Sequence, residues 1–254
     1  MDTEGGNAIA QFMTPQQRGS TLGQKAYASL CADIAGGRMM PGARVTLRGL
    51  ASTLNVSMQP VREAVSKLIA DELLELSNAR VVRVPRLTPL QLRELWSVRL
   101  LIEGELAYLC ACNATDAQID QLERNCQTML DRLLDPEIDV LRLLPAIYGN
   151  GLSFALGSGN ALLSGLASTM RLRAAPHIAE ALSQPAPMDK GFVSFTAQLS
   201  RETLYAVRAR DPDRTRHLRC VDLQTFQRMI FERLGIGDPA ARETFDYPDG
   251  IEQA

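Results

Sequence analysis

The side chains whose types and spacing suggest a chemistry lie between residues 45 and 65, on either side of a predicted turn. Arg48 precedes the turn, Ser57, Met58 and Gln59 follow it, and Arg62 comes three residues later. Guanidinium groups contact phosphates and guanine, a glutamine amide pairs with adenine, and methionine offers only apolar contact. This combination favours the recognition of DNA.

Two short helices joined by a tight turn would position these groups. Leu50 and Leu54 belong to an apolar stripe at helical spacing, and Asn55 tolerates the left-handed backbone of a turn. Ser57 is a natural N-cap, whose hydroxyl we expect to accept from a free backbone N–H of the second helix. Pro60 falls within the first turn of that helix, where a missing N–H costs nothing.

The flanking sequence bears on two interpretations of this segment, a DNA-reading motif and an ordinary helical hairpin. Upstream, residues 27–34 are apolar at helical spacing and are followed by Gly36, which ends a helix. Downstream, residues 73–84 change to the alternation of two strands, with a turn expected at Ser77 and Asn78. Three helices and a basic hairpin are typical of a winged helix-turn-helix domain. Its wing arginines, expected near the phosphate backbone, are Arg80, Arg83 and Arg86.

Charge is unevenly distributed along the chain. Residues 1–86 contain ten Lys or Arg and seven Asp or Glu, whereas the remainder contains 17 and 22. A positive excess confined to one small domain suits local phosphate contacts that weaken as salt rises. The excess is modest and does not by itself establish nucleic-acid binding.

A length of 254 residues favours two compact units. We expect a polar arm at residues 1–20, a winged domain at 21–86, a helical domain at 87–236 and a polar tail at 237–254. The arm lacks the features of a signal peptide, and no apolar run reaches membrane length, so no membrane partner is expected. Five scattered cysteines favour a reducing cytoplasm.

Beyond a linker near Pro85 to Pro89, helical spacing continues almost to the end of the chain. Six helices with short connections predict an antiparallel bundle, so the fold class is mostly α with a small β-hairpin wing. The interior between facing helices is a natural pocket for a small ligand. The expected helices span about 89–112, 116–134, 138–156, 161–182, 189–210 and 212–234.

The segment PGARVTLRGLASTLNVSMQPVREAVSKLIADELLEL resembles the N-terminal domain of GntR-type bacterial transcription regulators, without a gap. The resemblance implies that Arg48 and Arg62 keep phosphate and guanine contacts. Met58 and Gln59 replace the usual Arg and Thr, which predicts a related but altered operator, and Val81 replaces a wing glycine. The DNA-binding residues that we predict are Arg44, Arg48, Ser57, Met58, Gln59, Arg62 and Arg80.

The segment LQLRELWSVRLLIEGELAYLCACNAT resembles the first helix of the FCD ligand domain of the FadR subgroup. That family pattern implies a metal held by three His and one carboxylate. Aligned on Gly159-Asn160 and Asp211, the four positions fall on Ile147, Gly151, Ser200 and Asp222, so no family His is retained. We therefore expect no metal or other cofactor, and a cavity enlarged by the small residues Gly151 and Ser200.

An inward cation would then recognise an acidic effector. Arg99 shares a helix face with Trp96 and Glu103, and two roles are open for it, ligand binding and an ion pair with Glu103 four residues along. Arg171 is a weaker candidate with a surface role as the default, and His177 is expected to be solvated or capping. His217, one turn before Asp222, has a small chance of being a ligand. The predicted effector-binding residues are Arg99, Glu103, Ile147, Gly151, Arg171, Ser200 and Asp222.

Three function classes can be compared. The first is a transcription regulator that binds a palindromic operator in double-stranded DNA as a homodimer and senses a small organic acid or a related metabolite. The resemblance implies that it is a repressor. The second is an enzyme using the helical pocket, which would need a clustered acid, base or metal set that this sequence lacks. The third is a helical effector-binding protein with weakened DNA binding, which Met58 and Val81 favour.

Overall fold

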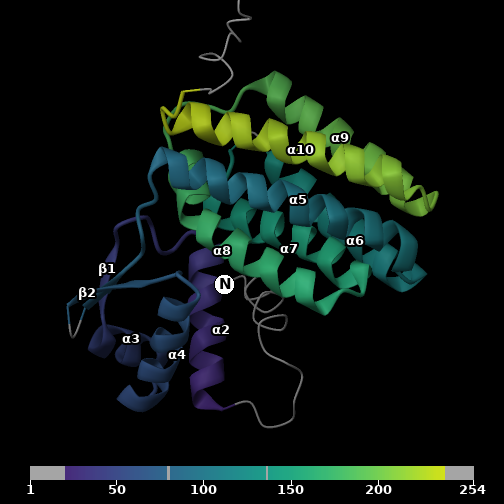
Figure 1. Cartoon of the computed structure of the whole chain (residues 1–254). Helices are drawn as coiled ribbons and strands as arrows, with labels where there is room; N and C mark the ends of the chain where they lie inside the picture. Colours follow the sequence, from purple (N-terminus) through teal and green to yellow (C-terminus); the bar gives the residue numbers. More distant parts are fainter. Residues whose placement is uncertain (1–20, 79–80, 136, 238–254) are drawn as a thin grey trace, which may run out of the picture.

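The computed structural model describes residues 21–78, 81–135 and 137–237. These residues form a small head, coloured purple to blue in Figure 1, at one end of a larger helical bundle. The predicted mostly helical fold with a small winged domain is confirmed.

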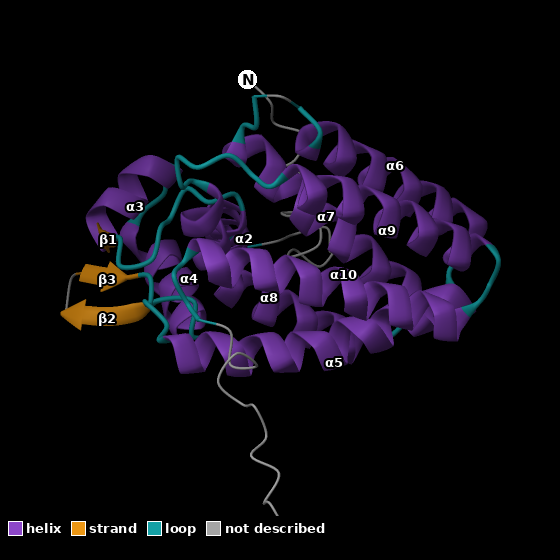
Figure 2. Cartoon of the chain, turned by 90° about the horizontal axis from the view of Figure 1, so that it is seen from above, coloured by secondary structure: helices purple, strands orange, loops and turns teal. Residues whose placement is uncertain are grey.

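The head contains three helices and a three-stranded antiparallel sheet. The strands lie at its outer edge in Figure 2 and pair in the order β1-β3-β2. Its elements are α2 (Leu22–Ala35), β1 (Arg44–Thr46), α3 (Leu47–Leu54), α4 (Met58–Ala70), β2 (Glu75–Asn78) and β3 (Val81–Arg83).

Two details of the sheet differ from the prediction. Strand β1 was not expected, because three residues are too few to show alternation, yet Val45 pairs with Val82 in β3. Ser77 and Asn78, where the sequence predicts a turn, belong instead to β2, which has a register shift between Leu76 and Asn78. The connection at residues 79–80, which includes the predicted DNA contact Arg80, lies outside the described residues.

The turn between α3 and α4 follows the sequence prediction in its backbone. Asn55 has a φ of 52°, the left-handed conformation that lets α3 end and the chain reverse. Ser57 occupies the N-cap position of α4, but its side chain makes no capping hydrogen bond. The expected capping role of this hydroxyl is therefore wrong, and the side chain is exposed at the surface.

The bundle contains the six helices that the sequence predicts, with ends that differ by at most two residues. Oxygen-bearing side chains cap their N-termini, including Thr115 and Asp211, as expected. No helix among the described residues is long and apolar enough to cross a lipid bilayer. The helices are α5 (Pro89–Asn113), α6 (Asp116–Leu133), α7 (Val140–Ser158), α8 (Ala161–Leu182), α9 (Lys190–Arg208) and α10 (Pro212–Arg233).

One apolar core continues from the head into the bundle. Leu30 of α2 and Leu68 of α4 belong to the same buried cluster as Leu106 and Tyr148 of the bundle. A second cluster surrounds Trp96, which is fully buried in the bundle. Because α2 packs against both α4 and α8, the head is seated on the bundle by apolar contact.

Polar contacts also join head and bundle, and most of them reach α8. Arg173 forms an ion pair with Glu72 of the head at 2.6 Å. Arg86, expected beside DNA, instead binds Glu180 of α8 at 2.9 Å and the backbone oxygen of Pro41. The arginine follows the last strand, so it sits at the linker and not in the wing.

Candidate functional site

Three predicted DNA-binding arginines lie on the surface of the head. Arg44, Arg48 and Arg62 are exposed, and none makes an ion pair or side-chain hydrogen bond within the described part of the chain. Arg62 lies in α4, next to the turn that α3 and α4 share. Unpaired guanidinium groups keep all their donors for an external anion.

Met58 and Gln59, the residues expected to alter base recognition, both make contacts within the head. Met58, the first residue of α4, is half-buried and packs against the apolar core of the head. Gln59 is exposed, and its side-chain amide donates to Glu63 at 3.1 Å. The outward groups of this helix are therefore Gln59 and Arg62, with Met58 contributing at most part of its side chain.

A buried ionic cluster occupies the interior of the bundle. The carboxylate of Glu103 on α5 accepts hydrogen bonds from Arg99 one turn earlier, from Arg171 on α8 and from Arg219 on α10. The Arg99 and Arg219 contacts measure 2.9 Å each. Arg219 also pairs with Asp222 at 2.6 Å. Three helices are thus tied together at one carboxylate.

The cluster carries one more positive charge than negative. Burial alone would raise the pKa of Glu103, but the three guanidinium groups outweigh it and hold that pKa at about 2. Burial lowers the pKa of Arg171 to about 10, so this group stays charged at neutral pH. Burial raises the pKa of Asp222, which its contact with Arg219 offsets only in part.

Gly151 of α7 makes room for this cluster. A Cβ atom at residue 151 would lie 1.6 Å from Nη1 of Arg171 and 2.0 Å from Nη2, far inside contact distance. The space that a longer side chain would take is therefore filled by the Arg171 guanidinium. The expectation that Gly151 enlarges the cavity is wrong, and so is a default surface role for Arg171, which is buried.

The four positions of the family metal site do not fit a metal ion. Ile147 and Gly151 have no donor atom in their side chains, and the cation Arg171 occupies the space beside them. Ser200 is buried near Cys126 and is not among the residues lining the cavity described below. Among the described residues, no group of three or more His, Cys, Asp or Glu is placed to hold a metal.

A cavity of about 50 Å³ adjoins the ionic cluster. Four polar side-chain atoms on its lining residues are buried and lack a hydrogen-bond partner, namely Nη1 of Arg99, Nε of Arg219, Oγ1 of Thr196 and Oδ1 of Asn150. Buried polar groups in proteins are nearly always paired, so these atoms mark a place for a polar ligand or water. The other walls are apolar and include Leu143, Ile147, Phe192, Leu223 and Phe226.

The structure brings together some of the predicted effector-binding residues. Arg99, Ile147, Arg171 and Asp222 line the cavity, whereas Glu103 lies behind it with its carboxylate bound by arginines. The ion pair expected between Arg99 and Glu103 is present through Nε of Arg99. Nη1 of Arg99 has no hydrogen-bond partner, and ligand binding by this group stays a prediction. Sequence reasoning missed Arg219. Its spacing of four from the buried residues Thr215 and Leu223 is the signal that could have found it.

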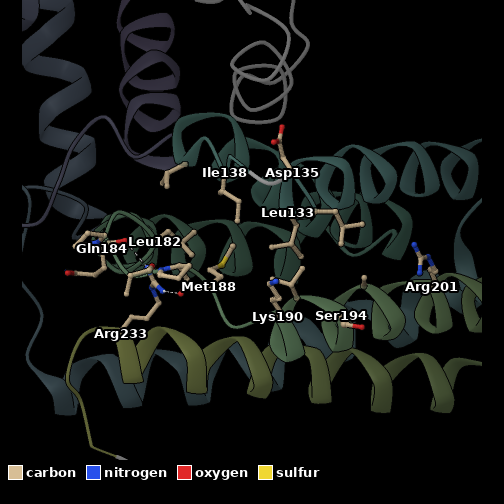
Figure 3. Close-up of a pocket in the computed structure, with 17 residues that line it drawn as sticks. Leu133, Asp135, Ile138, Leu182, Gln184, Met188, Lys190, Ser194, Arg201 and Arg233 are labelled. Carbon is tan, nitrogen blue, oxygen red and sulfur yellow. Dashed lines mark hydrogen bonds between the residues drawn. The ribbon is translucent and has the colours of Figure 1, made fainter.

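A larger groove of about 590 Å³ opens beside the cavity, between the α6–α7 and α8–α9 connections (Figure 3). Its wall is largely apolar, with Leu133, Ile138 and Met188 among the labelled side chains. Arg233 stands at one end and donates to the backbone oxygens of four residues, which are Ala181, Gln184, Ala186 and Pro187.

Neither histidine lines the cavity. His177 of α8 is buried, and its Nε2 accepts from the backbone N–H of Leu87 in the linker at 3.0 Å. The expectation of a solvated or capping histidine is wrong for His177, because this part of α8 faces the linker. Burial lowers its pKa to about 4, which keeps the ring neutral and able to accept. His217 is exposed on α10.

Comparison with known protein families gives a match for the head and another for the bundle. Residues 22–84 match the gntR family of bacterial regulatory proteins. Residues 94–222, which make up half of the chain, match the FCD domain. The chain belongs to the GntR family. This family consists of DNA-binding transcription regulators and not of enzymes, as the sequence predicts.

Curated relatives of this GntR-family chain share sequence similarity with it over about 100 residues. It is 32% identical to the HTH-type transcriptional regulator McbR of Escherichia coli over 97 residues, covering 38% of this chain and 42% of McbR. It is 33% identical to the E. coli HTH-type transcriptional repressor RspR over 104 residues, covering 41% and 46%. The chain therefore matches less than half the length of these curated relatives.

Solved structures of GntR-family proteins share the fold more widely. The structure of E. coli McbR superposes with a TM-score of 0.78 at 20% identity, covering 85% of this chain and 100% of McbR. A GntR regulator from Rhodococcus sp. RHA1, described as putative, superposes with a TM-score of 0.64 at 19% identity, covering 86% and 100%. At these identities the likeness concerns the fold alone.

Proposed function

We propose that this protein is a ligand-responsive repressor that binds a palindromic operator as a homodimer and senses a small organic acid in its bundle. The head would comprise residues 21–86 and the sensing and dimerising domain residues 87–236. The observation that carries the sensing role is the pair of unpartnered guanidinium donors of Arg99 and Arg219 on one buried cavity.

Arginines on the head support operator binding. Arg48 and Arg62 lie on the two helices that flank the turn at Asn55, and both are exposed without an internal partner. In a helix-turn-helix domain the second helix enters the major groove with its N-terminal residues toward the bases. On this geometry Gln59 and Arg62 contact base edges and phosphates, and Arg44 contacts the backbone from strand β1.

The ionic cluster supports an anionic ligand. Three arginines face two acidic residues, so the interior holds one uncompensated positive charge. A carboxylate in the cavity would receive the free donors of Arg99 and Arg219 and neutralise that charge. Charge-assisted hydrogen bonds in a buried site are strong and directional, which suits selective binding of an acid. The hydroxyl of Thr196 would donate a further hydrogen bond to it.

Helix α8 is placed to carry the signal from the cavity to the head. Arg171 binds Glu103 inside the bundle, and Arg173, two residues later on the opposite side of α8, binds Glu72 of the head. His177 and Glu180 of the same helix hold the linker. A ligand that redistributes the hydrogen bonds of Glu103 would shift α8 and change the position of the head. Such a shift alters operator affinity only if the ligand prefers one position over the other.

Exposed apolar side chains on the bundle support dimerisation. Leu101 and Val98 on α5 are 76% and 41% exposed, although both are large and apolar. A second copy packed against this helix would remove them from water and hold two heads for two half-sites. Cytoplasmic localisation follows from this function, since the operator lies in the bacterial nucleoid.

A gel-shift experiment with the duplex upstream of the protein's own gene tests both halves of the proposal. Wild type should bind, binding should fall steeply with salt, and acetate or butyrate should weaken it. Arg62→Ala should abolish binding at moderate salt, whereas Arg99→Ala should bind DNA but lose its response to the acid. Salt-insensitive binding would contradict the DNA interface, and a full acid response in Arg99→Ala would contradict the sensing site.

A further inference from the structure

We propose that the effector is an elongated amphipathic monocarboxylate, whose head lies in the buried cavity and whose apolar tail lies in the neighbouring groove. The inference rests on the proposed acid-sensing function and adds the class of acid. It follows from the sizes of the two spaces, the residues that they share and the chemistry of their walls.

The buried cavity is too small for a whole metabolite. One water requires roughly 10–15 Å³ of space measured with a water-sized probe. About 50 Å³ therefore holds on the order of four heavy atoms, which is a carboxylate with one attached carbon. Pockets that take complete small molecules usually measure about 300–1,000 Å³. The groove, at about 590 Å³, lies within that range.

The cavity and the groove meet at three apolar side chains. Leu133 of α6, Leu182 of α8 and Met188 of the α8–α9 connection line both spaces. In Figure 3, Leu133 and Met188 lie near the middle of the groove. A chain leaving the carboxylate site therefore passes between these residues. Met188 is half-buried and unbranched, so its side chain is the one best able to move aside.

The groove suits an apolar tail and offers little to a second anion. Arg233 is occupied by backbone oxygens of residues 181–187, so it fixes the connection that carries Met188. Lys190 and Arg201 are exposed to solvent at the rim, and Arg201 lies apart from the other labelled residues in Figure 3. The apolar walls are formed by Leu133, Leu134, Ile138, Val140, Leu182, Pro185, Met188 and Val193.

Calorimetric titration of the full chain with acetate, butyrate, hexanoate, octanoate and 1-octanol tests the class of acid. Each added methylene that enters the groove should tighten binding about fourfold, because burying a CH₂ contributes about 0.8 kcal/mol. Octanoate should bind at least a hundred times more tightly than acetate, and 1-octanol should bind far more weakly than octanoate. Equal affinity for octanol and octanoate would contradict a head bound in the cavity.

Variants at the meeting point of the two spaces test the route of the tail. Met188→Trp should narrow it and reduce octanoate affinity at least tenfold, a larger factor than any loss of acetate affinity, because acetate has no tail to pass this residue. Met188→Ala should widen it and admit a branched tail such as that of 2-propylpentanoate. Met40→Trp changes another partly exposed methionine, in the head, and should alter neither affinity.

The outcomes separate the inference from the proposed function. If acetate binds in an Arg99-dependent manner but longer acids bind no tighter, the elongated ligand is wrong and the sensing site stands. If every acid fails to bind wild type, both are wrong. If Met188→Trp leaves octanoate affinity unchanged, the tail does not pass this residue.

Discussion

The arginines of the head and those of the bundle face different surroundings. Arg48 and Arg62 of the head are exposed and lack internal partners in the described chain, whereas Arg99, Arg171 and Arg219 of the bundle are buried around Glu103. An exposed guanidinium suits a large external polyanion, which supplies many phosphates and is screened by salt. A buried one suits a small anion that can enter a cavity and is little affected by salt.

Burial thus separates the two roles that we propose for arginine, DNA recognition in the head and anion binding in the bundle. In the head, removing an arginine should cost DNA affinity and little stability. In the bundle, the arginines also hold three helices together, so the proposed sensing role and stability depend on the same groups.

Glu103→Gln should produce the largest effect. It leaves three buried guanidinium groups with Asp222 as their remaining acidic partner, and loss of one partner from a buried ion pair costs about 3–5 kcal/mol. Glu105→Gln is the matched control on the same helix, because Glu105 and Arg216 are each 41% exposed. That change should cost at most about 1 kcal/mol. Equal losses in urea unfolding would mean that the buried cluster does not stabilise the bundle.

The junction between the two regions should be sensitive to acid through His177. Its pKa is lowered from 6.5 to about 4, so the unfolded chain binds this proton first as pH falls. Stability should therefore decrease between about pH 6.5 and 4, by at most about 3 kcal/mol. His177→Gln keeps an acceptor for Leu87 and should flatten this part of the profile in urea unfolding. An unchanged slope in the variant would show that His177 is not the group responsible.

Gly151→Ala should disturb the bundle through Arg171. The added Cβ would overlap the guanidinium, and overpacking of this kind costs about 1–3 kcal/mol. Gly149→Ala, two residues earlier in α7, meets nothing within 4 Å and should stabilise the helix by up to about 1 kcal/mol. Thermal unfolding of the pair measures the difference. Stabilisation by both changes would contradict the placement of Arg171.

The helices and the winged head were predictable because their signals are local. Asn55, Thr115 and Asp211 mark turns and helix starts within a few residues of themselves, and helical spacing gives the elements between them. Strand β1 carries no such signal, since it exists through pairing with β3, more than 30 residues away.

The interior site was only partly predictable because it is assembled from distant segments. Arg99 and Glu103 are four residues apart on one helix, so their ion pair could be predicted from the sequence. Arg171 and Arg219 reach Glu103 from 68 and 116 residues away. The interaction of Arg171 with the space at Gly151 depends on how α7 and α8 pack, which one-dimensional spacing does not determine.

The most direct test of the two kinds of arginine is the salt dependence of DNA binding, measured by fluorescence anisotropy on the upstream duplex. For Arg62→Ala, the slope of log affinity against log salt should be shallower than that of wild type by about two phosphate contacts, one from each protomer of the dimer. For Arg99→Ala, the slope should equal that of wild type. A shallower slope in Arg99→Ala, or an unchanged slope and affinity in Arg62→Ala, would contradict the assignment of DNA to the head arginines and of the acid to the buried ones.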